Sequence, residues 1–303
     1  MPDTQQLSMP DPPSAPPPRD WHRTVIVVAA IAAVAALVGV LIVVVGGQGG
    51  SDGDAPAASS EAGRDTRDPL RPQGQSRLDP GTRSDTEAAV RNNWPLLTND
   101  EFDGTKIDPA LWSLYTGETT GGVGRHDPDN VTVNDGTMKI TSHGYSSAGM
   151  AWTQGQLHGR WEVRARAQQG VGYGAVILLW PDAEDWPEGG EINFMEIPNG
   201  ARNESHFVLH YSEDNSQIGT TTVGDFTQWH NYAVEWGPDH VAGFIDGQEI
   251  FRSSDPKTIP PRPMHLAIQQ DIGPYGKDWI PPLDDTTPER VQLEVDWVRI
   301  YGY

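Results

Sequence analysis

The apolar residues of this 303-residue chain follow two different patterns. The first is an uninterrupted apolar run, Val25–Val45. The second begins at about Trp94, where short segments rich in Val, Ile, Trp, Tyr and Phe alternate with turn clusters such as NDG. Alternating runs joined by such turns are typical of β-hairpins, and no long helical period follows. The pattern predicts an all-β domain over residues 93–303, built as a sandwich of two antiparallel sheets.

The apolar run is long enough to cross a bilayer. Its 21 residues would span about 31 Å as a helix, which matches a hydrocarbon core of about 30 Å. A cleaved signal peptide would have a shorter apolar stretch that ends at a small-residue cleavage site, so one transmembrane helix over residues 24–46 is favoured. Arg19 and Arg23 precede the run, whereas the sequence GGQGGSDGDAP follows it. The positive-inside rule therefore places a Pro-rich tail, residues 1–23, in the cytoplasm.

This arrangement predicts a single-pass protein of the cell membrane whose β domain is extracellular. Residues 47–92 mix Gly, Ser, Pro, Asp and Arg without any period, which is typical of a disordered, flexible linker. The lipid bilayer is then an expected partner through residues 24–46. The linker would hold the domain away from the membrane surface.

Charge and cysteine content exclude several classes of function. The formal net charge of −21 argues against a nucleic-acid partner, because phosphate binding requires a clustered basic surface. The chain has no cysteine, so it can form neither disulfides nor a thiolate zinc site. No His, Asp and Glu cluster has the spacing of a catalytic metal site, so no cofactor is expected. Acidic loops such as DAED could hold a structural calcium, which the sequence leaves undecided.

The segment GGEINFMEIP, residues 189–198, carries the candidate chemistry. In a strand, Glu191 and Asn193 point to one face and the apolar residues between them point to the other. Glu196 lies five positions after Glu191, so strict alternation would turn it toward the apolar face. One extra residue in a β-bulge near Phe194 and Met195 would return it to the polar face. The segment therefore predicts a bulged strand with two carboxylates on one side.

Two carboxylates on one face suit the cleavage of a glycosidic bond. One of them must be ionised to attack the anomeric carbon, and the other must hold a proton for the leaving oxygen. Asn193 lies between them and can donate an amide N–H to a carboxylate, which would stabilise the charged form. A solvent-facing pair of Glu residues remains the alternative reading of these residue types alone.

Three longer segments extend this motif into a resemblance. GRWEVRARAQQGVGYGAVILLWPDAEDWPEGGEINFME, DFTQWHNYAVEWGPDHVAGFIDGQEIF and the closing LEVDWVRIY resemble glycoside hydrolase family 16, the family of laminarinases, lichenases, agarases and carrageenases. The similarity covers about residues 102–301. The fold that it implies is a concanavalin-like β-jelly roll with a concave cleft, and the activity is that of a retaining glycoside hydrolase.

The resemblance also implies roles for the residues of the motif. Glu191 matches the family nucleophile and Glu196 the general acid/base, with the longer spacing of the laminarinase-like group. The middle residue of the family motif is normally Asp, whereas here it is Asn193. An amide cannot share a proton as a carboxyl group can, so the change is expected to lower activity or alter its pH profile.

Further residues are expected around a sugar-binding site. Trp186 resembles a family Trp whose indole would stack on a sugar ring, and Trp180 either does the same or packs in the core. His210 and Gln269 resemble polar groups near the site of related enzymes, although either could be a surface residue. Three other tryptophans lie in alternating strand patterns and are expected in the core: Trp161, Trp236 and Trp297.

Three functions remain to be distinguished. The leading hypothesis is an endo-acting hydrolase of a β-linked polysaccharide, with β-1,3-glucan favoured by the bulged spacing. The second is a polysaccharide-binding module that has lost turnover through the change at Asn193. The third is a transglycosylase of the cell envelope, because a second sugar could replace water as acceptor of the glycosyl-enzyme.

Overall fold

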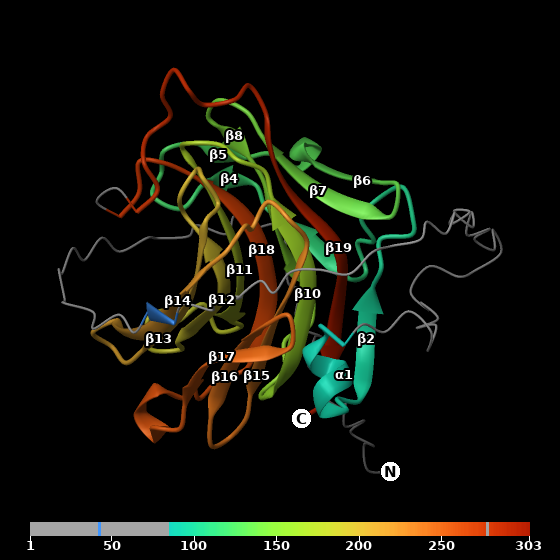
Figure 1. The fold of residues 1–303 in the computed structure, drawn as a ribbon, viewed down its shortest axis with the longest axis vertical. Coiled ribbons are helices and arrows are strands. Elements are labelled where there is room, and N and C mark those ends of the chain that lie inside the picture. The colour runs from blue at the N-terminus through green and yellow to red at the C-terminus, as the bar shows by residue number, and fades with distance from the viewer. Residues whose placement is uncertain (1–41, 44–84, 277–278) are drawn as a thin grey trace, which may run out of the picture.

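The computed structural model of the chain describes residues 42–43, 85–276 and 279–303 (Figure 1). Within these ranges the regular secondary structure is almost entirely β-strand. No helix in this described part has the length and apolar character needed to cross a membrane.

Most of the N-terminal segments expected from the sequence lie outside the described residues. This applies to the cytoplasmic tail, residues 1–23, and to nearly all of the transmembrane helix, residues 24–46. Two residues of that expected helix are described, and they form a short strand, β1 (Ile42–Val43), parallel to Thr221 and Thr222. At these two positions the structure has a strand where a helix was expected.

The strands form two large sheets that pack face to face. Sheet A contains, in spatial order, β1, β14 (Ser216–Val223), β13 (Glu204–Tyr211), β12 (Glu191–Ile197), β11 (Tyr173–Pro181), β18 (Met264–Ile272), β9 (Gly149–Trp152) and β3 (Trp112–Leu114). Sheet B contains β17 (Gln248–Ser253), β16 (Val241–Ile245), β15 (His230–Trp236), β10 (Gly159–Ala167), β19 (Val291–Tyr301), β7 (Thr137–Ser142) and β6 (Val131–Asn134), and β2 (Leu96–Asp100) also pairs with β19.

The remaining elements are short. A small third sheet joins β4 (Gly117–Glu118), β5 (Arg125–His126) and β8 (Ser146–Ser147), and the helices are α1 (Ala88–Asn92), η1 (Pro128–Asn130) and η2 (Pro256–Thr258). Figure 1 shows the two layers, with β11–β14 and β18 in one and β10, β19 and β7 in the other. The predicted all-β sandwich is confirmed.

The main core lies between the two sheets. Alternate residues of each strand enter it, for example Ile177 and Phe194 from sheet A and Val163 from sheet B, all almost fully buried. A second, smaller apolar group around Val176 and Leu178 lies on the opposite side of β11. Each strand of sheet A therefore has a core face and an outer face.

The three tryptophans expected in the core are all buried. Trp161 and Trp236 belong to the main core, where their rings stack with centroids 6.2 Å apart. Trp297 is also buried, but it lies outside the main core, beneath the guanidinium of Arg299 at 4.0 Å from the ring centroid. Burial was predicted correctly for all three residues.

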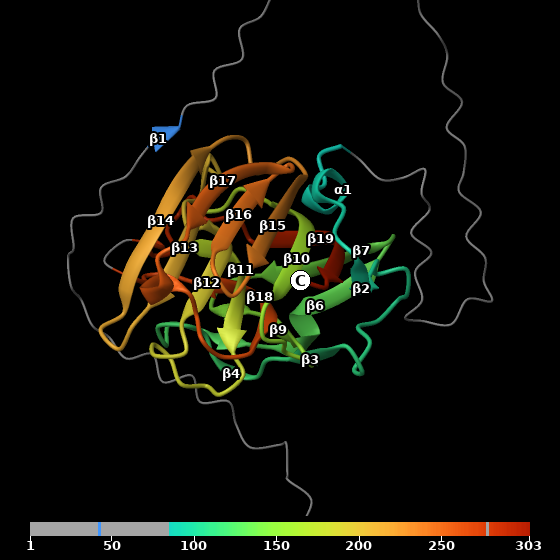
Figure 2. The ribbon, with the colours of Figure 1, turned by 90° about the horizontal axis from the view of Figure 1, so that it is seen from below.

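The residues just before the expected domain boundary pack against sheet B. The buried carboxylate of Glu162 accepts hydrogen bonds from the first two backbone N–H groups of α1, at 2.6 and 3.1 Å. Trp94 packs edge-on against Phe244 and Tyr301 in the same cluster. Figure 2 shows α1 beside β15, β16 and β19. Residues 85–92, which the sequence placed at the end of the linker, are thus part of the folded domain.

Candidate active site

A β-bulge in β12 positions the two candidate carboxylates. Asn193 pairs with Val208 of β13, but Glu196 pairs with His206, so three steps along β12 face two steps along β13. The pairing of β12 with β11 shows the same one-residue shift. Phe194 is accommodated as the extra residue, and the bulge predicted from the sequence is confirmed.

The bulge sorts the side chains of β12 between the two faces. Ile192, Phe194 and Met195 are all buried in the main core. Phe194 and Met195 are neighbours in sequence, so strict alternation would have turned one of them to the outer face. Glu191 and Glu196 are both half-buried. They lie on the outer face of sheet A, within the range of mutual charge repulsion.

Glu196 is held by an indole and has a perturbed acidity. Its Oε1 accepts a hydrogen bond from Nε1 of Trp279 at 2.7 Å. Burial raises the pKa of Glu196 to about 7, although the Trp279 bond and the nearby His210 act in the opposite direction. The negative charge of Glu191 acts in the same direction as burial and is part of this shift in the pKa of Glu196. A carboxyl group with this pKa is partly protonated near neutral pH, as a general acid must be.

Asn193 lies between the carboxylates in a chain of polar contacts. Its Nδ2 is 3.5 Å from Oε2 of Glu196 and 3.4 Å from Nε2 of His210. The same Nε2 is 4.0 Å from Oε2 of Glu191. At the other side of the ring, Nδ1 of His210 is 2.7 Å from Oδ1 of Asn215. The structure thus joins the three residues of the predicted motif to His210, which the sequence analysis also singled out, and to Asn215, which it did not.

A third carboxyl group, that of Asp271, borders this cluster. Burial raises the pKa of Asp271 to about 6, while hydrogen bonds from Gln269 and Thr120 act to lower it. Nε2 of Gln269 lies 3.0 and 3.2 Å from the two carboxylate oxygens and 3.2 Å from Oγ1 of Thr120. Gln269 is therefore occupied in holding Asp271 in place.

The two candidate platform tryptophans lie side by side. The rings of Trp180 and Trp186 stack at 6.3 Å with an interplanar angle of 13°. Trp186 is 6.3 Å from the ring of His210, and Trp180 packs with the apolar residues of the outer face of β11. Its indole N–H donates to Glu184 at 3.0 Å. Trp186 therefore lies beside His210, and Trp180 lies beside Trp186 on the outer face of sheet A, outside the main core.

Sequence reasoning missed Trp279 and its support. The ring of His206 contacts Trp279 with centroids 4.5 Å apart, and Nδ1 of His206 lies 2.9 Å from Oγ1 of Thr221. Trp279 follows a Pro- and Gly-rich segment after β18, where no periodic pattern indicates the direction of a side chain. The pairing of β12, β13 and β14 places His206 and Thr221 beside Glu196, and Trp279 reaches Glu196 from the segment after β18.

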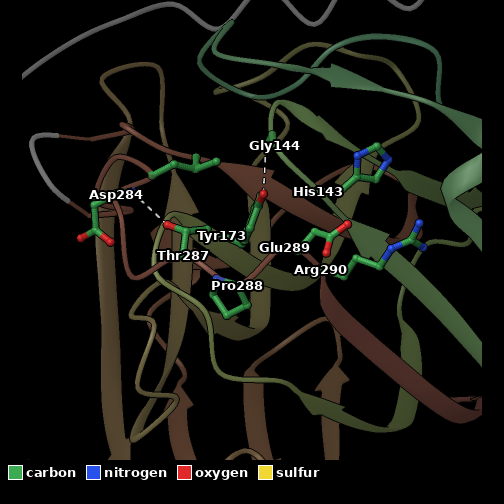
Figure 3. Close-up of a pocket in the computed structure, with 9 residues that line it drawn as sticks. His143, Gly144, Tyr173, Asp284, Thr287, Pro288, Glu289 and Arg290 are labelled. Atoms are coloured by element: carbon green, nitrogen blue, oxygen red, sulfur yellow. Dashed lines mark hydrogen bonds between the residues drawn. The ribbon is translucent and has the colours of Figure 1, made fainter.

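No group of three His, Asp or Glu residues within the described ranges has the geometry to hold a metal ion. A separate hollow of about 360 Å³ lies away from the carboxylates. Figure 3 shows His143, Tyr173, Asp284, Glu289 and Arg290 around it. None of its lining residues belongs to the carboxylate cluster. The concave cleft that the family resemblance implied stays a prediction.

The fold and the bulged Glu pair agree with comparisons to known proteins. Residues 124–299 match the family model described as glycosyl hydrolases family 16. This chain belongs to that family. It is therefore a glycosidase, an enzyme that hydrolyses O-glycosyl bonds.

Individual relatives extend the comparison. A beta-glucanase of Rhodothermus marinus is 27% identical over 250 residues, which cover 70% of this chain and 86% of the relative. A glucan endo-1,3-beta-glucosidase A1 of Niallia circulans is 25% identical, over 73% of this chain and 39% of the relative. The laminarinase catalytic domain of Thermotoga petrophila superimposes with a TM-score of 0.64 at 24% identity, covering 69% of this chain and 98% of that domain. The fold is thus the jelly-roll sandwich of this family.

Proposed function

We propose that the chain is an endo-acting, retaining hydrolase of β-1,3-glucan and that Glu191 and Glu196 are its catalytic pair. The observation that carries the proposal is the bulge in β12, which turns both carboxyl groups onto one face of sheet A. The five-residue spacing and the printed activities of the Rhodothermus and Niallia relatives support a β-glucan substrate.

In the first step, Glu196 would donate its proton to the glycosidic oxygen while Glu191 attacks the anomeric carbon. The bond from that carbon to the leaving oxygen breaks, and a glycosyl ester on Glu191 forms. The raised pKa of Glu196 supports this role, because the acid form must be present at the start of the reaction.

In the second step, Glu196 would act as a base. It removes a proton from water, whose oxygen attacks the anomeric carbon and releases Glu191 as a carboxylate. The N–H of Trp279 and the amide N–H of Asn193 face the two oxygens of Glu196 and would stabilise the carboxylate form at this stage.

The sugar rings would lie along the outer face of sheet A. Trp180 and Trp186 are the proposed stacking platform, and His210 is the proposed polar contact beside it. Gln269 contributes indirectly, since its amide group is bonded to Asp271. Asp271 is a further candidate contact for a sugar hydroxyl.

The test is to incubate the full-length chain with laminarin, mixed-linkage glucan, agarose and carrageenan and to measure released oligosaccharides. We expect cleavage of laminarin, with the β-anomer appearing first in the product, and a loss on the order of a thousandfold or more in Glu191→Gln. Glu204→Gln is the matched control, because Glu204 is also a Glu of sheet A but its side chain is 45% exposed and, among the described residues, forms an ion pair with His206 alone, at 3.9 Å.

Each other outcome identifies a competing function. The parent chain could bind glucan saturably without cleaving it, and this binding could persist in Glu191→Gln. That result would show that the domain is a binding module and not a hydrolase. Products longer than the substrate at high acceptor concentration would instead indicate a transglycosylase.

We also propose that residues 24–46 anchor the chain in the cell membrane, with residues 1–23 in the cytoplasm and the catalytic domain outside. The uninterrupted apolar run and the preceding Arg residues support this arrangement. Intact cells that express the full chain should lose the domain on protease treatment, and a chain lacking residues 1–46 should leave the membrane fraction. Recovery of the full chain in the soluble fraction would contradict the proposal.

A further inference from the structure

The amide of Asn193 sits where the family motif normally has a carboxyl group, and its surroundings show how this chain uses the difference. Asn193 is only 3% exposed. Its Nδ2 faces Glu196 and His210, whereas no described residue donates to its Oδ1. The orientation of this amide therefore depends on the two groups that its nitrogen faces.

The hydrogen-bonding capacity of these groups sets one consistent arrangement. An ionised Glu196 can only accept, so a nitrogen of Asn193 must face it. The same nitrogen is 3.4 Å from Nε2 of His210, so that ring atom must present its lone pair. The ring proton then resides on Nδ1, where Oδ1 of Asn215 accepts it at 2.7 Å.

We propose that His210, held in its Nδ1–H tautomer by Asn215, is a positioning residue that turns the amide nitrogen of Asn193 toward Glu196. The inference rests on the proposed function, since Glu196 is taken as the acid/base. It extends that function by giving Asn193 a role in this chain: the amide supports the carboxylate form that Glu196 adopts in the second step. An ionised Asp at position 193 would present only acceptors to both neighbours and would favour the opposite arrangement.

The other groups around the imidazole are compatible with this assignment. Glu191 approaches Nε2 no closer than 4.0 Å, and the Trp186 ring is 6.3 Å away. The residue opposite His210 on β14 is Gln217, which is uncharged. Asn215 therefore has the shortest contact to the ring, and the turn between β13 and β14 decides the tautomer.

Asn215 can be removed without straining the backbone. It has a φ of 55°, in the left-handed region that glycine adopts freely, so Asn215→Gly deletes the acceptor alone. Ser212 lies in the same turn with a φ of 66°. Ser212→Gly is therefore a matched control that changes the turn but leaves the acceptor.

The first measurement is independent of activity. The 15N and 1H spectra of the full-length chain labelled at histidine report which ring nitrogen carries the proton, and His210→Gln identifies the His210 signals by their loss. We expect Nδ1–H in the parent chain and in Ser212→Gly, a mixture of tautomers in Asn215→Gly, and a proton on Nε2 in Asn193→Asp. A parent chain with the proton on Nε2 overturns the inference, whatever its activity.

The second measurement is the pH profile of laminarin hydrolysis. Asn215→Gly should lower kcat roughly tenfold with little change in KM, which is the effect of one misdirected hydrogen bond. Ser212→Gly should match the parent chain. A changed tautomer with an unchanged kcat would overturn the positioning role. A parent chain that cleaves no glucan would defeat the proposed function, while the tautomer spectra would still decide the arrangement around Asn193.

Discussion

At the scale of single residues, the acidity of Glu196 results from two opposing effects. Burial disfavours its charged form and raises the pKa to about 7. The indole N–H of Trp279 can only donate a hydrogen bond, so it favours the carboxylate and lowers the pKa. This balance leaves Glu196 able to give up a proton and to take one back near neutral pH.

Removing the indole N–H should shift this balance upward. In Trp279→Phe, the pKa of Glu196 should rise above about 7 by roughly one unit, because a hydrogen bond to a charged group contributes about 1.5 kcal/mol or more. Activity that requires the protonated acid is lost as pH rises through this pKa, so the basic limb of kcat/KM for laminarin should move to higher pH.

Trp180→Phe is the control for this measurement. It also removes one indole N–H from the outer face of sheet A, but that group donates to Glu184 instead of Glu196. Its pH profile should keep the position of the basic limb even if KM changes. An unmoved or lowered limb in Trp279→Phe would show that Trp279 does not control Glu196.

The bulged strand β12 shows which parts of the candidate site a local sequence pattern can predict. Alternation and one extra residue were sufficient to predict that Glu191, Asn193 and Glu196 share a face. The contacts from Trp279 and Asp271 could not be predicted in the same way. Trp279 lies 83 positions from its partner Glu196, and its approach depends on the register of sheet A.

At the scale of elements, the segment from α1 to β2 joins the N-terminal side of the domain to sheet B. Trp94 is 5% exposed and packs against Phe244 and Tyr301. The five residues of α1 are too few to display a helical period, so the sequence pattern assigned this segment to the linker. This segment is buried because of tertiary contacts. The carboxylate of Glu162 accepts hydrogen bonds from the backbone of α1, and the apolar surface of sheet B covers the segment.

Loss of the Trp94 ring should therefore weaken the whole domain. We expect Trp94→Ala to lower the free energy of unfolding by about 3 kcal/mol, the lower end for truncating a buried aromatic side chain. Urea denaturation followed by tryptophan fluorescence and circular dichroism measures this change. The KM for laminarin of the folded protein should stay the same, because the cluster lies on the outer face of sheet B.

Leu97→Ala provides the comparison for this variant. Leu97 belongs to β2 but is 62% exposed, so its truncation should change stability by less than about 0.5 kcal/mol. Equal effects of the two substitutions would show that the segment around Trp94 does not pack as described.

At the scale of the whole molecule, positive charge is divided unequally between the two sheets. The strands of sheet A contain no Lys or Arg, whereas those of sheet B contain six, Lys139, Arg160, Arg164, Arg166, Arg252 and Arg299. Sheet A also presents Glu191, Glu196 and Asp271 on one face. The face proposed to bind substrate is thus acidic, in a chain with a net charge of −21.

This asymmetry should favour neutral over anionic polysaccharides. We expect kcat/KM for carboxymethylated β-1,3-glucan to be several-fold lower than for the unmodified polymer at low salt, because like charges repel across the site. Salt screens that repulsion, so raising the ionic strength from about 0.01 to 0.15 M should narrow the difference. Hydrolysis of the neutral polymer serves as the control and should change little. Faster cleavage of the anionic polymer at low salt would contradict the prediction.

The position of α1 also affects how the domain can be attached to other bodies. The segment that opens the domain packs on the outer face of sheet B, which carries none of the candidate site residues (Figure 2). A bead, a surface or a fusion partner joined just upstream of residue 85 would therefore lie on the sheet B side of the domain, opposite the face proposed to bind substrate. A long glucan strand lying over the Glu191 side could extend past both ends of the domain without colliding with that support.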